Sequence, residues 1–97
     1  MTITINSKEY SIEIGNVVWK TVKEECNFSP FGNPLAFSTD PKAVEVACKK
    51  AIELAGGKID AKELDKMDTQ EVFLNARVFM KELSEAIEYV NSLDEKK

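Results

Sequence analysis

Four acidic residues close together form the most obvious candidate for a chemical site. They are Asp60, Glu63, Asp65 and Asp68. Grouped carboxylates can bind calcium, but an EF-hand loop needs oxygen ligands at alternate positions and a central glycine. Here Lys62 and Leu64 stand where ligands are needed, and no central glycine follows. We therefore expect a solvated helix surface, with Asp60 and Glu63 as the capping box of a short helix that ends near Met67.

Catalytic groups of other kinds are scarce. The chain has no histidine, which removes most zinc sites, the serine and cysteine triads and the usual general base at neutral pH. The Gly56-Gly57-Lys58 run follows no expected strand, so a helix C-terminus explains it better than a phosphate-binding loop. Cys26 and Cys48 are expected to be reduced, small buried hydrophobic residues, and a disulfide between them is the alternative. The sequence predicts no enzymatic activity, no metal and no cofactor.

The charge balance bears on partners and location. The chain of 97 residues carries 13 Lys and Arg against 17 Asp and Glu, a net charge of −4. No basic stripe exists to follow a nucleic-acid backbone. The sequence contains no run of about 18 apolar residues, the length that a membrane-spanning helix needs. The N-terminus lacks the features of a signal peptide. We expect a single cytoplasmic domain over residues 1–97 that binds neither nucleic acid nor membranes.

Residues 2–14 have the pattern of a β-hairpin. Residues 2–5 and 10–14 alternate apolar and polar side chains, and residues 6–9 between them are polar turn formers. An isolated hairpin is marginally stable in water, so we expect its apolar face to pack on a helix.

Helical periodicity replaces this alternation after Gly15. A first helix is expected over Val17–Cys26, with Asn16 as its N-cap and Trp19 on its buried side. A second helix is expected to begin at Asp40-Pro41, and Gly56-Gly57 marks its end. The change of period predicts an α+β fold, in which an N-terminal hairpin packs on a mostly helical domain with a long C-terminal helix.

Residues 27–40 separate these two helices. The segment contains two prolines, one glycine and three phenylalanines, including Phe31 and Phe37. Long connections without secondary structure are often functional, so one interpretation is a loop that becomes ordered on binding. The other is that the phenylalanines cover the bottom of the core.

The strongest pattern lies in the last segment, from an Asp68 cap to about Leu93, followed by a solvated tail at 94–97. Its apolar residues form three neighbouring rows. The rows are Phe73–Met80–Ile87, Ala76–Leu83–Val90 and Val72–Phe79–Ala86–Leu93. We expect the first two rows to fill the core and the third to face a second copy or a helical client. The alternative is that all three rows belong to the core.

Two groups of residues are therefore candidates for a protein-interaction surface. They are Val72, Phe79, Ala86 and Leu93 of the last segment, and Phe31 and Phe37 of the 27–37 loop.

The N-terminal residues resemble those of a known family. Ile3-Thr4-Ile5-Asn6-Ser7-Lys8-Glu9-Tyr10, followed by a short strand and a helix, resembles the start of the tail assembly chaperones of long-tailed phages and prophages. The mostly helical remainder and the short acidic chain are similar too. The resemblance implies a non-enzymatic, self-associating protein that coats the tape measure protein while tail tube subunits polymerise around it. In many members a frameshifted, longer form recruits those subunits.

Two other classes remain open. One is a structural virion component, such as a head–tail connector or a tail-completion protein. The other is a small bacterial protein–protein adaptor with no phage link. A gene position just upstream of a very long tape-measure-like gene favours the chaperone, whereas presence in purified virions favours the structural component.

Overall fold

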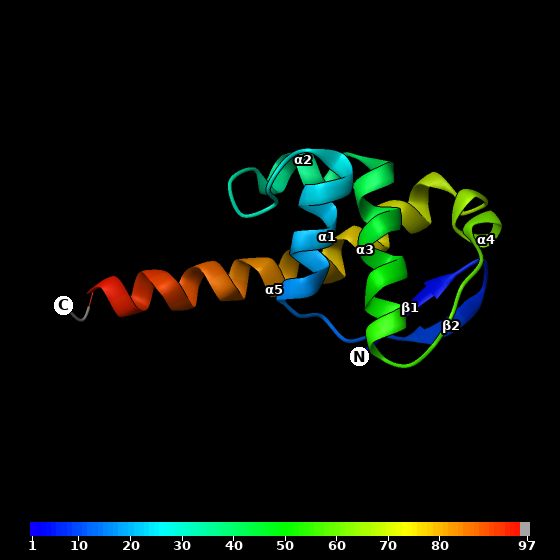
Figure 1. The fold of residues 1–97 in the computed structure, drawn as a ribbon, viewed down its shortest axis with the longest axis horizontal. Helices are drawn as coiled ribbons and strands as arrows, with labels where there is room; N and C mark the ends of the chain where they lie inside the picture. The colour runs from blue at the N-terminus through cyan, green and yellow to red at the C-terminus, as the bar shows by residue number, and fades with distance from the viewer. Residues whose placement is uncertain (96–97) are drawn as a thin grey trace.

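A hairpin followed by helices makes up the fold (Figure 1). The computed structural model describes the backbone of residues 1–95 and the side chains of residues 1–93. Over these residues the order is β1 (Thr2–Ile5), β2 (Lys8–Ser11), α1 (Asn16–Cys26), α2 (Pro34–Ser38), α3 (Pro41–Leu54), α4 (Ala61–Asp65) and α5 (Thr69–Glu95). The expected α+β fold, with its N-terminal hairpin and long C-terminal helix, is confirmed.

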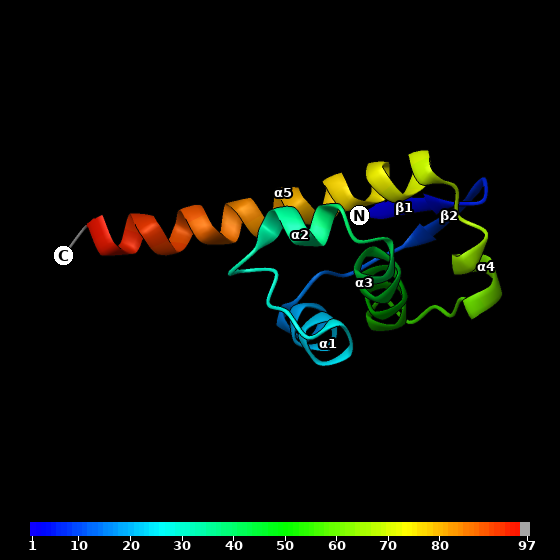
Figure 2. The same ribbon diagram turned by 90° about the horizontal axis from the view of Figure 1, so that it is seen from above.

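α5 runs along one side of the whole domain (Figure 2). Its N-terminal half lies beside β1, and α2 and α3 pack against it further along. α1 packs mainly on α3 and lies on the far side of the body from α5. The C-terminal part of α5 continues past the other elements, which contributes to the elongated dimensions of 47 × 24 × 23 Å.

The hairpin turn is tighter than the sequence suggested. The turn consists of Asn6 and Ser7, with φ angles of 51° and 68°, and Ile5 pairs with Lys8 directly across it. Two successive positive φ angles are typical of the type I′ turn, whose twist matches that of the two strands. The expected turn over residues 6–9 was therefore too long, because Lys8 already belongs to β2.

Carboxylates from two helices hold this turn in place. The Asn6 backbone N–H donates to the Glu71 carboxylate of α5, with N···O distances of 2.9 and 3.2 Å. The Asn6 side-chain amide donates to the Glu63 carbonyl at 2.7 Å and to the Glu63 carboxylate at 3.1 Å. The expected capping box was wrong, because Asp60 makes no side-chain cap bond and Glu63 binds the hairpin instead.

The helix ends follow local sequence in most places. The Asp40 carboxylate accepts from the Lys42 N–H at 3.0 Å, and Asp68 accepts from the Glu71 N–H at 2.8 Å, so both expected caps are confirmed. Gly56 follows α3 with a φ of 90°, the left-handed conformation that favours glycine. At α1 the N-cap is Gly15 and Asn16 is the first helical residue, so the expected Asn16 cap was wrong.

Aromatic rings from three helices form the centre of the core. Trp19 of α1 is buried, as expected, and lies edge-on to Phe37 of α2 at 5.6 Å and to Phe79 of α5 at 6.2 Å between ring centroids. Phe37 and Phe79 also meet edge-on, at 6.2 Å. This geometry is the favourable one for aromatic pairs. The cluster fixes how α5 is rotated about its own axis.

The C-terminal boundary differs slightly from the expectation. α5 continues through residues 94 and 95, two positions beyond the predicted end at Leu93. The remaining residues of the expected solvated tail, 96 and 97, lie outside the described residues.

Candidate protein-interaction surface

The N-terminal half of α5 buries a single stripe. Its apolar members are Val72, Ala76, Phe79 and Leu83. Asn75 is also buried, and its amide donates to the Thr4 carbonyl of β1 at 3.0 Å and lies 3.2 Å from the Met67 sulfur. A buried amide is tolerated when it has such partners. Asn75 therefore belongs to the core-facing side of α5.

This position of Asn75 explains why part of the expected interaction row is wrong. Val72 and Phe79 are buried, so they cannot contact a partner from the folded domain, whereas Phe73 is 52% exposed. Successive residues of a helix turn by about 100° around its axis. Viewed along this axis, the buried Asn75 and Ala76 lie on either side of Val72. The buried sector is thus centred on the row that we expected to face outward.

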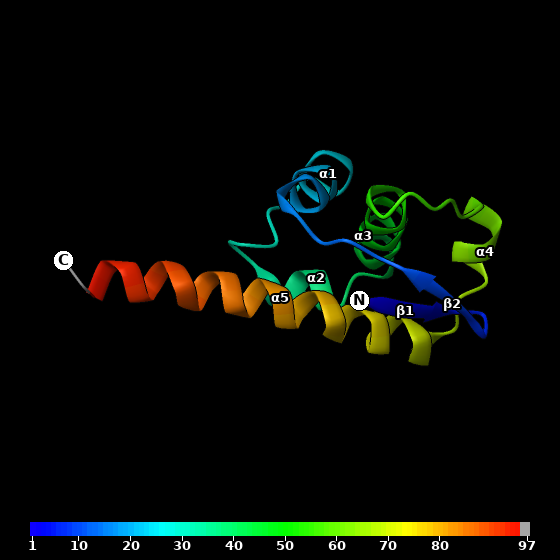
Figure 3. The ribbon, with the colours of Figure 1, turned by 90° about the horizontal axis from the view of Figure 1, so that it is seen from below.

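Beyond Leu83, the same stripe leaves the domain body. We call residues 84–95 of α5 the arm, and Figure 3 shows the arm extending past α1 and α2. Ala86 and Ile87 are half-buried where the arm begins. Further along, Tyr89 is 65% exposed, Val90 55% and Leu93 46%. We call the apolar surface formed by the half-buried Ala86 and Ile87 and the exposed Tyr89, Val90 and Leu93 the arm strip.

Two of the predicted interaction residues, Ala86 and Leu93, lie in the arm strip. The strip differs in extent from the prediction, because Val90 was expected in the core and is exposed. The buried stripe of residues 72–83 packs against β1, α2 and α3, and these elements do not extend along the arm. The apolar periodicity of the sequence continues along the whole helix, so it does not indicate where the packing of other elements against α5 ends.

The 27–37 loop is ordered by its own short helix. α2 begins after Asn33, whose side chain accepts from the Ala36 N–H at 3.2 Å. Phe37 is fully buried and cannot serve as a contact residue, which corrects that prediction. Phe31 is 43% exposed and lies edge-on to Trp19 at 6.1 Å. The interpretation that the phenylalanines cover the core is right for Phe37, and Phe31 remains available to a partner.

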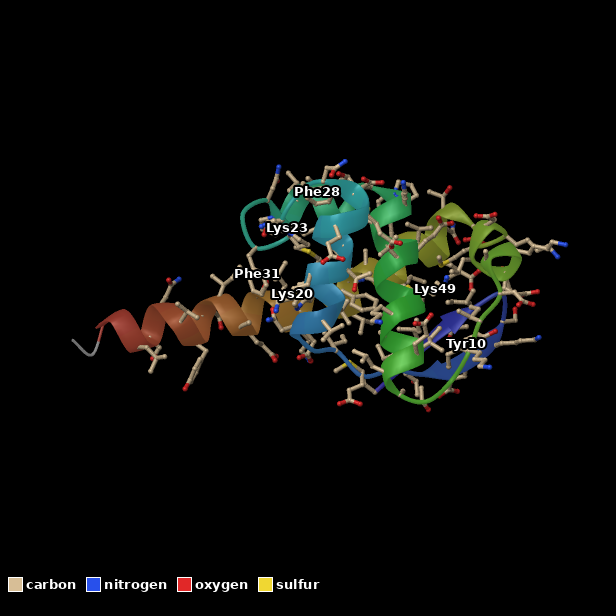
Figure 4. The ribbon with its side chains drawn as sticks, in the orientation of Figure 1. Tyr10, Lys20, Lys23, Phe28, Phe31 and Lys49 are labelled. Carbon is tan, nitrogen blue, oxygen red and sulfur yellow. The ribbon has the colours of Figure 1, made fainter. Side chains whose placement is uncertain are left out.

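The surface of the body next to the arm combines Phe31 with two lysines. Lys20 and Lys23 lie on α1 beside Trp19, and both are exposed. Figure 4 shows both lysines and Phe31 at the end of the body from which the arm projects. We call this surface the wall. The arm and the wall meet at an angle, so the arm strip is bordered at its base by an aromatic and basic surface.

Among residues 84–93 of the arm, the charged side chains lie away from the strip. By helical geometry Glu85 and Glu88 are on the side opposite Val90, and both are exposed. Tyr89 in the strip and Asn91 beside it are neutral. A helix can therefore approach residues 86–93 of the strip from the side opposite Glu85 and Glu88.

A second exposed apolar surface lies on the outer side of α5 and was missed from the sequence. Phe73 and Leu74 are both more than half exposed. The shallow depression beside Leu74 is also lined by the apolar Val78 and Met80 and by the polar Arg77, Lys81 and Ser84. These polar side chains interrupt the apolar surface after one turn. The arm strip contains two of the predicted interaction residues, and we regard it as the candidate site.

The acidic cluster is dispersed over separate roles. Asp68 caps α5, Glu63 binds Asn6, and Asp60 precedes α4. Within the described residues, no three His, Cys, Asp or Glu side chains gather closely enough to hold a metal ion.

Neither cysteine is in a disulfide. Cys48 is buried between α3 and the core, and burial raises the pKa of its thiol to about 12. Burial, followed by the nearby Asp40 carboxylate, also raises the pKa of the half-buried Cys26. A thiol of raised pKa is a poor nucleophile at neutral pH, so neither group is set up for catalysis.

Neither membrane-span criteria nor comparison with known proteins adds a lead to the function. None of the helices in residues 1–95 combines the length and apolar character that a membrane span requires. Searches of protein-family models, curated proteins and solved structures find no match to this chain.

Proposed function

We propose that this protein is a non-enzymatic assembly chaperone of the kind found in long-tailed phages and prophages, and that its arm strip binds an apolar helix of a client. The client is the tape measure protein, and tail tube subunits are recruited to the resulting complex in the host cell cytoplasm. One observation supports this proposal most directly: the apolar stripe of α5 continues onto the arm, where Val90 and Leu93 remain exposed.

The chemistry of the surface agrees with a helical client. An amphipathic helix that binds a groove or strip uses apolar side chains spaced three or four residues apart. Ile87, Val90 and Leu93 have this spacing. Soluble monomers rarely leave such a continuous apolar surface in water. The limited length of the strip favours reversible binding, which an assembly chaperone needs because it leaves its client.

The first test is gene order: a very long tape-measure-like gene is expected just downstream of the coding sequence, and its product is then coexpressed with this chain. Wild type is expected to keep that client soluble and to copurify with it. Val90→Ser combined with Leu93→Ser is expected to abolish copurification, whereas Glu88→Gln, on the opposite side of the arm, leaves it unchanged. Circular dichroism of each variant confirms the fold. Equal capture by all three proteins would refute the proposed binding surface.

Purified particles distinguish the chaperone from a structural component. A chaperone is expected in the assembly mixture and absent from finished virions. Stoichiometric retention in the virions would instead support a head–tail connector or a tail-completion protein. The absence of any tail genes near the coding sequence would support a bacterial adaptor.

A further inference from the structure

We infer that a second copy of this chain covers the arm strip, through a two-fold pairing in which two arms lie antiparallel about Val90. The end of each arm then enters the angle between the partner's arm and wall. This inference goes beyond the proposed function: the second copy covers the strip when no client is bound, and a client helix binds there by displacing it.

The spacing of the strip is self-complementary about Val90. Ile87 and Leu93 lie three residues before and after it. When two helices run antiparallel with Val90 opposite its counterpart, Ile87 of each copy faces Leu93 of the other. A two-fold interface requires this reciprocity, because the same surface is used on both copies. Val90 then meets Val90 and Ile87 meets Leu93, so the centre of the pairing is apolar.

The charges allow this pairing and favour its direction. Val90 and its neighbours Tyr89 and Asn91 are uncharged, so no like charges meet across the two-fold axis. Glu85 and Glu88 project from the opposite side. The carboxyl end of a helix has the negative pole of the helix dipole, and antiparallel pairing brings this end toward the wall, where Lys20 and Lys23 are exposed. Parallel pairing would place the two negative ends together.

The wall extends the apolar contact. Leu93 is two residues before the end of α5, so in the antiparallel pair it lies near the base of the other arm, beside Phe31. The exposed parts of Phe31, Tyr89, Val90 and Leu93 offer on the order of 400 Å² of apolar surface. A standard interface buries about 800 Å² per partner, of which roughly 60% is apolar. The available area therefore suits a small, reversible dimer.

Cysteine cross-linking tests the axis directly. Val90→Cys is made in a Cys26→Ser background, in which the remaining native thiol, Cys48, is buried. Under mild oxidation Val90→Cys is expected to form a disulfide-linked dimer as the main product. The matched control is Glu88→Cys on the opposite side of the same arm, for which we expect at least about ten-fold less dimer, because productive disulfides need closely spaced Cβ atoms. Equal cross-linking of both variants would overturn the axis.

Sedimentation equilibrium tests the pairing without added cysteines. Wild type is expected to be a monomer–dimer mixture at roughly 10–200 µM, the micromolar range expected of a small interface. Leu93→Ser should weaken the dimer about ten-fold or more. Lys20→Glu combined with Lys23→Glu should also weaken it, and added salt should reduce the difference from wild type. A wild type that stays monomeric across this range would refute the pairing, whether or not a client binds the strip.

Discussion

Replacing Phe79 by alanine tests how α5 is oriented in the domain. Phe79 is fully buried and lies edge-on to Trp19 and Phe37 at 6.2 Å each. Removing a buried phenylalanine ring costs about 3–5 kcal/mol, because apolar burial is lost and a cavity remains. The whole domain is expected to be stable by only about 5–15 kcal/mol, so this single change should remove a large part of its stability.

The matched control is Phe73→Ala, which makes the same chemical change on the same helix. Because Phe73 is 52% exposed, about half of its ring remains in water, and its removal should cost about 1 kcal/mol or less. Both variants are measured by urea unfolding, followed by far-ultraviolet circular dichroism, since the fluorescence of Trp19 would respond to the loss of its neighbour Phe79.

The two possible orientations of α5 give opposite results. If Phe73 faces the core, as periodicity alone suggested, Phe73→Ala should be the more destabilising variant. Equal costs, or a cost below about 1 kcal/mol for Phe79→Ala, would refute the packing described above.

Three further changes test other contacts. Since burial raises the pKa of Cys48 from 9.0 to about 12, the unfolded chain loses this proton in that pH window while the folded chain keeps it. The free energy of unfolding should therefore fall as pH rises above 9.0, by up to about 1.4 kcal/mol per pH unit; urea titrations should show a shallower fall for Cys48→Ala. Asn75→Leu should cost about 1–3 kcal/mol because it leaves the Thr4 carbonyl without its donor, and a cost near zero in thermal unfolding would contradict the buried bond. Asn6→Ala should be less stable than Asn6→Gly by about 1 kcal/mol, because glycine accepts the positive φ; the reverse order would show that this φ is not retained.

Features encoded within a few residues could be predicted from the sequence. The change of period after Gly15 gave the hairpin and the helices, and Asp40-Pro41 and Gly56 marked the ends of α3. Each of these signals acts through backbone groups no more than four residues away. The sequence therefore predicted the fold class and most boundaries.

Contacts between distant residues could not be predicted in this way. Asn6 and Glu71 are 65 positions apart, and Thr4 and Asn75 are 71 apart. Nothing in the local pattern shows that a polar Asn75 is buried, and this residue decides which side of α5 faces the core. Of the predicted row, Ala86 and Leu93 therefore lie in the arm strip, whereas Val72 and Phe79 are buried and were assigned to the wrong side of α5.

The carboxylate clamp on the hairpin turn has a consequence for how the chain folds as it is synthesised. β1 and β2 leave the ribosome first, but Glu71 and Asn75, which hold Asn6 and Thr4, are made after most of the chain. An isolated hairpin is marginally stable, and pairing of residues so far apart carries a large loop-closure cost. We therefore expect the N-terminal strands to stay largely unfolded until the residues of α5 that bind them have been synthesised. We expect the last helix to form and close the domain in a single late step, which makes nascent chains that stop before residue 71 unable to fold the hairpin.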